Sequence, residues 1–169
     1  VPEEGEDSFL REINTNEGKA KVLAQQFFPK KPEHSRVPEN YNYPEPLPPL
    51  PPITPEQIER QIKRLSPFKA SGPDEIPNVV LQKCLEHLSE YLLHLFRGIF
   101  NLRTYYTGWQ EFTMAVLKKP DKPNYELPKA WRPIALLCTI PKVLTAIVAE
   151  GISHLVEKNT LLPDTHFGG

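Results

Sequence analysis

Residues 109–144 read WQEFTMAVLKKPDKPNYELPKAWRPIALLCTIPKVL. Two runs in this stretch, FTMAVLK at 112–118 and RPIALL at 132–137, combine apolar and β-branched side chains between turn-forming segments, and both predict strands. Three prolines between the runs exclude regular structure there, because proline lacks a donor and has a fixed φ. The segment therefore predicts an antiparallel hairpin with a long tip.

Helical patterns flank this hairpin on both sides. Residues 140–156 place apolar side chains on one helical face. Upstream, Thr54-Pro55-Glu56-Gln57 combines a capping residue, a first-turn proline and a capping-box glutamine, and it predicts a helix that ends before Pro67. A long helix is predicted from Pro77 to about Tyr105. Its apolar positions are four and three residues apart in turn, at Leu81, Leu85, Leu88, Leu92, Leu95, Ile99 and Leu102.

The N-terminal third has a different composition. Twenty of the 169 residues are proline, and ten of these fall between Pro29 and Pro55. Residues 17–28 predict a short helix, and residues 44–55 predict an extended polyproline II spacer. The expected fold class is α+β, with helices around a small antiparallel β-hairpin and a proline-rich extended N-terminal arm. We expect residues 1–54 to form an acidic head helix and a linker, and 55–169 to form the folded body.

Charge and cysteine content exclude several classes. The net charge of -1 excludes a histone-like polycation or an acidic tail protein. Residues 1–60 carry -4 and residues 61–169 carry +3, which hints that the body meets a polyanion, although a solvated surface explains this equally well. Cys84 and Cys138 alone cannot form a disulfide framework. Without a signal-like start or an apolar run near ~18 residues, we expect an intracellular protein of nucleus or cytoplasm, neither secreted nor bound to membrane.

Positive charge is concentrated at the mouth of the hairpin, by which we mean the loop between the two strands and the strand ends beside it. Between residues 118 and 132 there are five cations and two acids; the cations are Lys118, Lys119, Lys122, Lys129 and Arg132. A fixed cation on each strand, Arg132 facing Lys118 or Lys119, would grip a triphosphate or a nucleic-acid backbone. A hydrated loop tip without a partner is the alternative reading of the same charges.

Other catalytic patterns are weak in this sequence. The four aspartates lie far apart, whereas a two-metal site needs converging carboxylates. Cys84, His87 and His94 are at helical spacing but have no fourth ligand. We therefore expect no metal site, no cofactor and no catalytic residue within this chain.

Several segments together resemble a known family. They are SPFKASGPDEIPN, the predicted long helix, residues 109–144 and LLPDTHFGG, with TNEGKAKVLAQQFFPKKP ahead of them. These resemble the opening part of the reverse transcriptase of non-LTR retrotransposons, particularly fungal ones. The KP-x-KP run followed by WRPI and the loop KASGPD-x-IPN are the most specific parts of the resemblance.

The resemblance implies the fingers of a right-hand polymerase. It places Arg132, with Lys118 or Lys119, at the triphosphate of an incoming deoxynucleotide, and it places Lys69, Ser71 and Gly72 in a loop that contacts template RNA. The palm with the catalytic aspartates, for which Mg²⁺ is expected, and the thumb would lie outside residues 55–169. The chain is accordingly expected not to polymerise alone.

Three residues depart from the family pattern as the resemblance implies it. Glu75 stands at a usual glycine and would strain a turn that needs positive φ. Thr145 replaces a usual acid, and Gly151 replaces a usual arginine.

A second hypothesis is a non-enzymatic interaction module. It would use the apolar helices and the Pro46–Pro52 tract, whose PxxP spacing fits SH3- or WW-type domains, although a stiff spacer also explains the tract.

Overall fold

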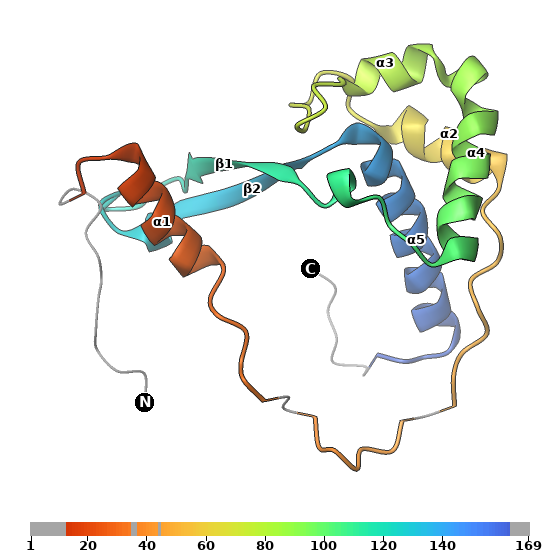
Figure 1. The fold of residues 1–169 in the computed structure, drawn as a ribbon, viewed down its shortest axis with the longest axis horizontal. Coiled ribbons are helices and arrows are strands. Elements are labelled where there is room, and N and C mark those ends of the chain that lie inside the picture. The colour runs from red at the N-terminus through yellow and green to blue at the C-terminus, as the bar shows by residue number, and fades with distance from the viewer. Residues whose placement is uncertain (1–12, 35–36, 44, 163–169) are drawn as a thin grey trace. The chain divides into compact units, whose positions relative to one another are not determined.

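The computed structural model describes residues 13–34, 37–43 and 45–162, so the predictions for residues 1–12 and for the terminal motif at 163–169 lie outside the described residues. In chain order the elements are α1 (Asn16–Phe27), α2 (Pro55–Arg64), α3 (Asn78–Lys83), α4 (Leu85–Leu102), η2 (Thr107–Trp109), β1 (Phe112–Lys118), η3 (Pro128–Ala130), β2 (Trp131–Leu137) and α5 (Thr139–Lys158) (Figure 1). The α+β class and the antiparallel pair β1-β2 are confirmed.

The chain divides into two compact units. Among the described residues, the hairpin unit holds those between 13 and 46 and residues 114–135, and the helical unit holds residues 47–113 and 136–162. Within the hairpin unit, α1 packs against η3. Thr15 caps α1 by accepting a hydrogen bond from the Gly18 amide at 3.1 Å, which explains why the predicted head helix begins where it does.

The helical unit is built around α2, which packs on both α4 and α5. The predicted capping box is present: Thr54 Oγ1 accepts from the Gln57 amide, and Gln57 Oε1 accepts from the Thr54 amide at 2.9 Å. Ile58 and Ile62 of α2 are fully buried, as their spacing predicts. They share one core with Ile53, which lies just ahead of α2, and with residues of the other helices, namely Leu81, Leu92, Phe96, Val143, Leu144 and Ile147.

The predicted single helix from Pro77 to Tyr105 is wrong in two respects. It is broken at Cys84, whose φ and ψ of -95° and 6° lie outside the helical range, and α4 ends at Leu102. The break allows α3 to pack on α2, where the Gln82 amide donates to the carbonyls of Ile62 and Leu65 at 3.2 and 2.7 Å. These bonds tie α3 to the C-terminal end of α2, where the Ile62 carbonyl also accepts from the Leu65 amide at 3.2 Å.

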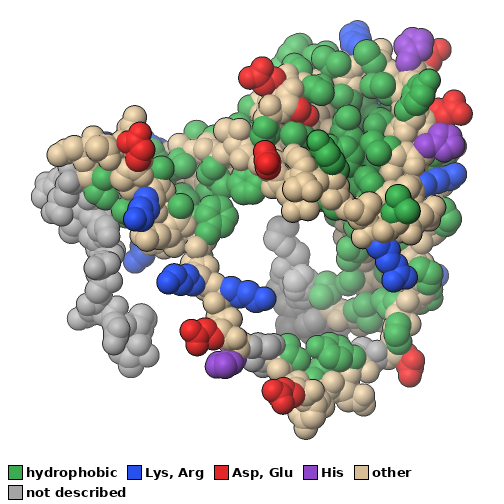
Figure 2. All heavy atoms as spheres, viewed as in Figure 1, with side chains coloured by type: hydrophobic (Ala, Val, Ile, Leu, Met, Phe, Trp, Pro, Cys, Tyr) green, Lys and Arg blue, Asp and Glu red, His purple; other side chains and the backbone are tan. Residues whose placement is uncertain are grey.

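The predicted apolar stripe of α4 is also partly wrong. Leu95 and Leu102 are 43% and 75% exposed, whereas Phe96 is fully buried. The stripe holds at Leu85, Leu88, Leu92 and Ile99, which are buried or half-buried, whereas Phe96 takes the core position predicted for Leu95. Hydrophobic side chains therefore remain on the surface of this unit (Figure 2), among them Val80, Tyr91 and Phe100.

The loop between α2 and α3 is held by a buried polar network. Thr139 Oγ1, fully buried, donates to the Ile76 carbonyl at 2.8 Å and also lies 3.1 Å from Asn78 Oδ1. Asn78 Nδ2 donates to the Ser66 carbonyl at 2.8 Å, and Asp74 accepts from the Ile76 and Thr139 amides. Asp74 thus caps α5 from a distant part of the sequence, because residue 138 offers no side-chain cap.

One exposed ion-pair cluster joins α2 to α5. Glu150 accepts from Arg60 at 2.6 Å and from Gln61 at 3.0 Å, and Arg64 lies 3.7 Å away. The Arg60 hydrogen bond is the largest of the influences that hold the pKa of Glu150 below its ordinary value. Because the three charged side chains Arg60, Arg64 and Glu150 are about two-fifths or more exposed, the ion pairs orient the two helices but add little to stability.

The long helix α5 differs from the expectation of no membrane-length segment. Although Lys142 and Glu150 interrupt it, α5 is long and apolar enough to cross a membrane by length and composition, and it is the one helix in the described ranges that meets this criterion. Its buried residues Val143, Leu144 and Ile147 belong to the core shared with α2 and α4. Core packing therefore accounts for these three apolar positions of α5, whereas Ile152 is 51% exposed.

Glu75 confirms the strain expected at a position where the resemblance places glycine. Its φ is 53°, and its amide donates to the Gly72 carbonyl at 3.0 Å to close a turn. A left-handed conformation costs a non-glycine residue about 1–2 kcal/mol. Replacing Glu75 with glycine would remove this cost, but the greater backbone entropy that glycine loses on folding offsets part of the stability gained.

We expect Glu75→Gly to raise the free energy of unfolding by about 0.5–1 kcal/mol, measured by urea unfolding of the full chain. The matched control is Glu86→Gly in the first turn of α4, where glycine lowers stability by about 1 kcal/mol. Equal destabilisation by both substitutions would contradict the strain at Glu75.

Candidate functional site

The register of the hairpin determines which cations share a face. The Lys119 amide donates to the Ala130 carbonyl at 2.8 Å, and β1 and β2 are each seven residues long. In a regular antiparallel pair this bond sets Lys118 opposite Trp131 and Leu117 opposite Arg132. Pro133 then lies opposite Val116, at a position whose backbone nitrogen points away from β1.

Lys119 and Arg132 therefore lie on one face of the hairpin, and Lys118 lies on the other. Lys119 and Arg132 are diagonal neighbours, a relation that separates residues by about 7–8 Å and leaves long side chains within reach of each other. Of the two lysines weighed as the partner of Arg132, the register favours Lys119. Leu117 and Ile134 lie on the same face and are both exposed.

Lys118 is engaged by aromatic rings on its own face. Its Nζ atom lies 4.9 Å from the centre of the Tyr125 ring and 5.6 Å from that of Trp131. The two rings meet edge to face at 6.2 Å, and Trp131 Nε1 donates to the Tyr125 carbonyl at 2.9 Å. A cation over a ring stabilises an exposed site by about 0.5–1 kcal/mol. We conclude that Lys118 helps to hold the hairpin tip in shape.

The side chains of Lys119 and Arg132 differ in how many hydrogen-bond donors they leave for a ligand. Lys119 Nζ donates to the Lys129 carbonyl at 2.9 Å, which fixes the ammonium but uses one of its three donors. The Tyr125 hydroxyl donates to the Lys119 carbonyl at 2.8 Å and so ties the tip to the end of β1. Arg132 is exposed, and its guanidinium has no hydrogen-bond or ion-pair partner among the residues that the structure describes. Its planar guanidinium presents five donors in a fork that matches phosphate.

The predicted template-contact residues occupy a loop of the helical unit. Lys69 is exposed, Ser71 is half-buried and Gly72 is buried. A side chain at Gly72 would collide with the backbone of Leu137 and Cys138, so this glycine permits a close approach of two chain segments. Burial gives Gly72 a packing role, and the surface that could meet a ligand is that of Lys69 and Ser71.

The metal-like residues do not converge. Within the described ranges there is no group of three or more histidine, cysteine, aspartate or glutamate side chains arranged to hold a metal ion. Cys84, His87 and His94 are the residues at helical spacing. Of these, His94 has its Nε2 atom 3.9 Å from Glu90 Oε1 of the same helix.

One functional feature is missing from the sequence-based prediction. The aromatic cluster that holds Lys118 depends on Tyr125, which lies in a proline-rich loop where spacing predicts no contact. The register itself, with Lys118 opposite Trp131, is the signal that could have revealed it, because cross-strand neighbours on one face interact.

Comparison of the sequence with known proteins identifies the class of protein to which this chain is related. No protein-family model matches the chain. Over 120 residues, or 71% of the chain, it is 32% identical to the probable RNA-directed DNA polymerase from transposon X-element of Drosophila melanogaster. Over the same length it is 29% identical to the probable polymerase from transposon BS of that species, and 24% identical to the polymerase from mobile element jockey of Drosophila funebris.

The chain is therefore related to a segment of reverse transcriptases, the RNA-directed DNA polymerases of mobile elements. More particularly, these relatives support the expected reverse transcriptase of a non-LTR retrotransposon. The chain spans 13% of the length of each of them. They come from Drosophila, so the fungal origin suggested by the resemblance has no support in these comparisons.

Proposed function

We propose that this chain is the fingers part of the RNA-directed DNA polymerase of a non-LTR retrotransposon, and that its hairpin binds the phosphates of the incoming deoxynucleoside triphosphate. The observation that carries the proposal is the 120-residue similarity to such polymerases, since it includes most of the chain. The face formed by Lys119 and Arg132 supplies the chemistry, and Lys69 and Ser71 contact template RNA in this proposal.

The two cations have distinct roles in phosphate binding. Arg132 is free to form a bidentate pair with phosphate oxygens, which adds orientation as well as charge. Lys119, already held by the Lys129 carbonyl, acts as a fixed point charge beside it. Lys118 contributes indirectly, because its contacts with Tyr125 and Trp131 stabilise the tip that carries the other two.

We expect Arg132→Ala to weaken binding of deoxynucleotide or template RNA by about tenfold, since a hydrogen bond to a charged group contributes about 1.5–3 kcal/mol. The measurement is fluorescence anisotropy with the full chain at several salt concentrations. The log-log salt slope should be about -2 to -4 for the parent chain and should shrink by about 1 in the variant.

Lys158→Ala is the matched control for that measurement, because Lys158 is an exposed cation at the end of α5. It should leave both affinity and salt slope nearly unchanged. Equal losses in the two variants, or an affinity independent of salt, would contradict phosphate binding by the hairpin.

The proposal also separates binding from catalysis. In it, the aspartates that hold Mg²⁺ belong to the palm, a partner domain outside this chain. The test is to incubate the chain with primed template RNA, deoxynucleotides and Mg²⁺. No primer extension is expected, and extension by the chain alone would refute this part of the proposal.

The interaction-module hypothesis has one observation in its favour. The prolines of the Pro46–Pro52 tract are exposed and could meet an SH3- or WW-type domain. Pull-down with such domains, using chains with and without the tract, distinguishes the hypotheses. Binding that does not depend on the tract would remove its support.

A further inference from the structure

The segment Leu47–Ile53 has a repeat that fits the polyproline II conformation. It reads LPPLPPI, so an apolar non-proline residue recurs at every third position. Polyproline II has three residues per turn, and therefore Leu47, Leu50 and Ile53 fall on one face. In the structure this segment is neither helix nor strand.

Burial follows the same three-residue period. Ile53 is 6% exposed and Leu50 is half-buried, whereas the prolines between them and ahead of them are exposed. Leu47 is 38% exposed, so contact with the helices weakens toward the N-terminal end of the segment. Leu50 and Ile53 are thus turned toward the helices, and the prolines are turned toward solvent.

The surface under Leu50 is a groove between α4 and α5. Its lining includes Phe100 of α4 and Ile147, Val148 and Gly151 of α5. Gly151 leaves room for the leucine, because a Cβ atom there would lie 2.8 Å from Leu50 Cδ2. The glycine that departs from the resembled family therefore provides the space that this segment fills.

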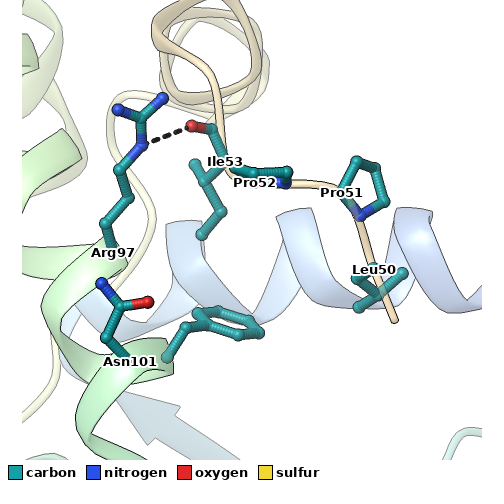
Figure 3. Close-up of a pocket in the computed structure, with 7 residues that line it drawn as sticks. Leu50, Pro51, Pro52, Ile53, Arg97 and Asn101 are labelled. Atoms are coloured by element: carbon teal, nitrogen blue, oxygen red, sulfur yellow. Dashed lines mark hydrogen bonds between the residues drawn. The ribbon is translucent and has the colours of Figure 1, made fainter. Parts of the chain in front are cut away.

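A backbone hydrogen bond completes the contact. Arg97 Nε of α4 donates to the Ile53 carbonyl at 2.9 Å (Figure 3). Beside it, a pocket of about 470 Å³ is lined by the segment and by Arg97, Phe100 and Asn101. Aromatic side chains line the grooves that recognise polyproline II segments, and Phe100 supplies one here, while the Arg97 donor adds a bond to the segment's backbone.

We propose that Leu47–Ile53 is a polyproline II ligand bound in cis by the groove between α4 and α5, a strap that hides the apolar face of the chain's own PxxP segment. Ile53 anchors the strap, because it lies in the core and directly precedes Thr54, the N-cap of α2. Leu47 and Leu50 form the part that can lift. A protein that needs this face can bind only the lifted fraction, so its apparent affinity falls in proportion to that fraction.

The test is methyl NMR on the full chain with labelled leucine, isoleucine and valine. Contacts between the Leu50 methyl groups and both the Phe100 ring and Val148 are expected in the parent chain. Gly151→Leu should abolish these contacts while contacts within the core, such as those of Ile62, persist. The control is Gly98→Leu in α4, since a Cβ atom at Gly98 meets nothing within 4 Å. This control should keep the Leu50 contacts.

A second variant keeps the proposal testable if Gly151→Leu fails to fold. Leu50→Ser removes the apolar contact in the middle of the strap without adding bulk. The backbone order parameters of residues 47 and 50 should fall from about 0.8 to below about 0.6, while that of Ile53 changes little. Absence of the Leu50 contacts in the parent chain, or order parameters unchanged by Leu50→Ser, would overturn the proposal.

Discussion

Replacing Phe96 with alanine is expected to lower the free energy of unfolding by about 3–5 kcal/mol, the range for deleting a fully buried aromatic side chain. Phe96 has no exposed surface and belongs to the core where α2, α4 and α5 meet. Removing its ring leaves a cavity that the three helices cannot close without moving together. The measurement is urea unfolding of the full chain, followed by circular dichroism.

Leu95→Ala is the matched control, because Leu95 is the adjacent residue of the same helix and is 43% exposed. It should cost about 1 kcal/mol or less, since nearly half of the Leu95 surface is already in contact with water. A heptad stripe predicts the opposite order, with Leu95 as the core residue. A larger loss for Leu95→Ala than for Phe96→Ala would therefore contradict the packing of α4.

Gly72→Ala is expected to destabilise the helical unit by about 3 kcal/mol, at the upper end of the usual cost of overpacking. The added Cβ atom would meet backbone atoms of Leu137 and Cys138, which cannot rotate away as a side chain can. Relief of the collision must push the loop from the start of α5 and lengthen the bond between Asp74 and the Thr139 amide. Thermal and urea unfolding measure the loss.

Gly98→Ala serves as the control for that substitution. Gly98 lies in α4 with open space around its Cα atom, and alanine is favoured over glycine within a helix by about 0.5–1 kcal/mol. The control should therefore gain stability while Gly72→Ala loses it. If both substitutions stabilised the chain, the close approach at Gly72 would be refuted.

Local signals in the sequence were sufficient for the hairpin and for the helix starts. The bounds of β1 are those predicted, and β2 begins one residue earlier, at Trp131. The capping box at Thr54 is a contact between residues three apart, so its chemistry is visible in the sequence. The break at Cys84 is not visible in this way, because it depends on bonds from Gln82 to carbonyls about twenty residues upstream.

The candidate site also has features that the local sequence predicts and features that depend on distant parts of the chain. The sequence brings Lys118, Lys119 and Arg132 to one hairpin mouth, and the strand bounds agree with that placement. Which lysine shares a face with Arg132 depends on the register, and the register is set by the length and folding of a proline-rich tip. For the loop residue Gly72, spacing cannot separate ligand contact from packing, whereas burial assigns it to packing.

Pro133 has a consequence for how the hairpin can associate. Each strand of a two-stranded ribbon has an outer edge where a third strand could add by backbone pairing. Since the nitrogen of Pro133 points away from β1, the proline removes a donor from the outer edge of β2 and leaves the ladder between the strands intact. Augmentation by an extended segment is therefore directed to the outer edge of β1, beside Met114 and Val116.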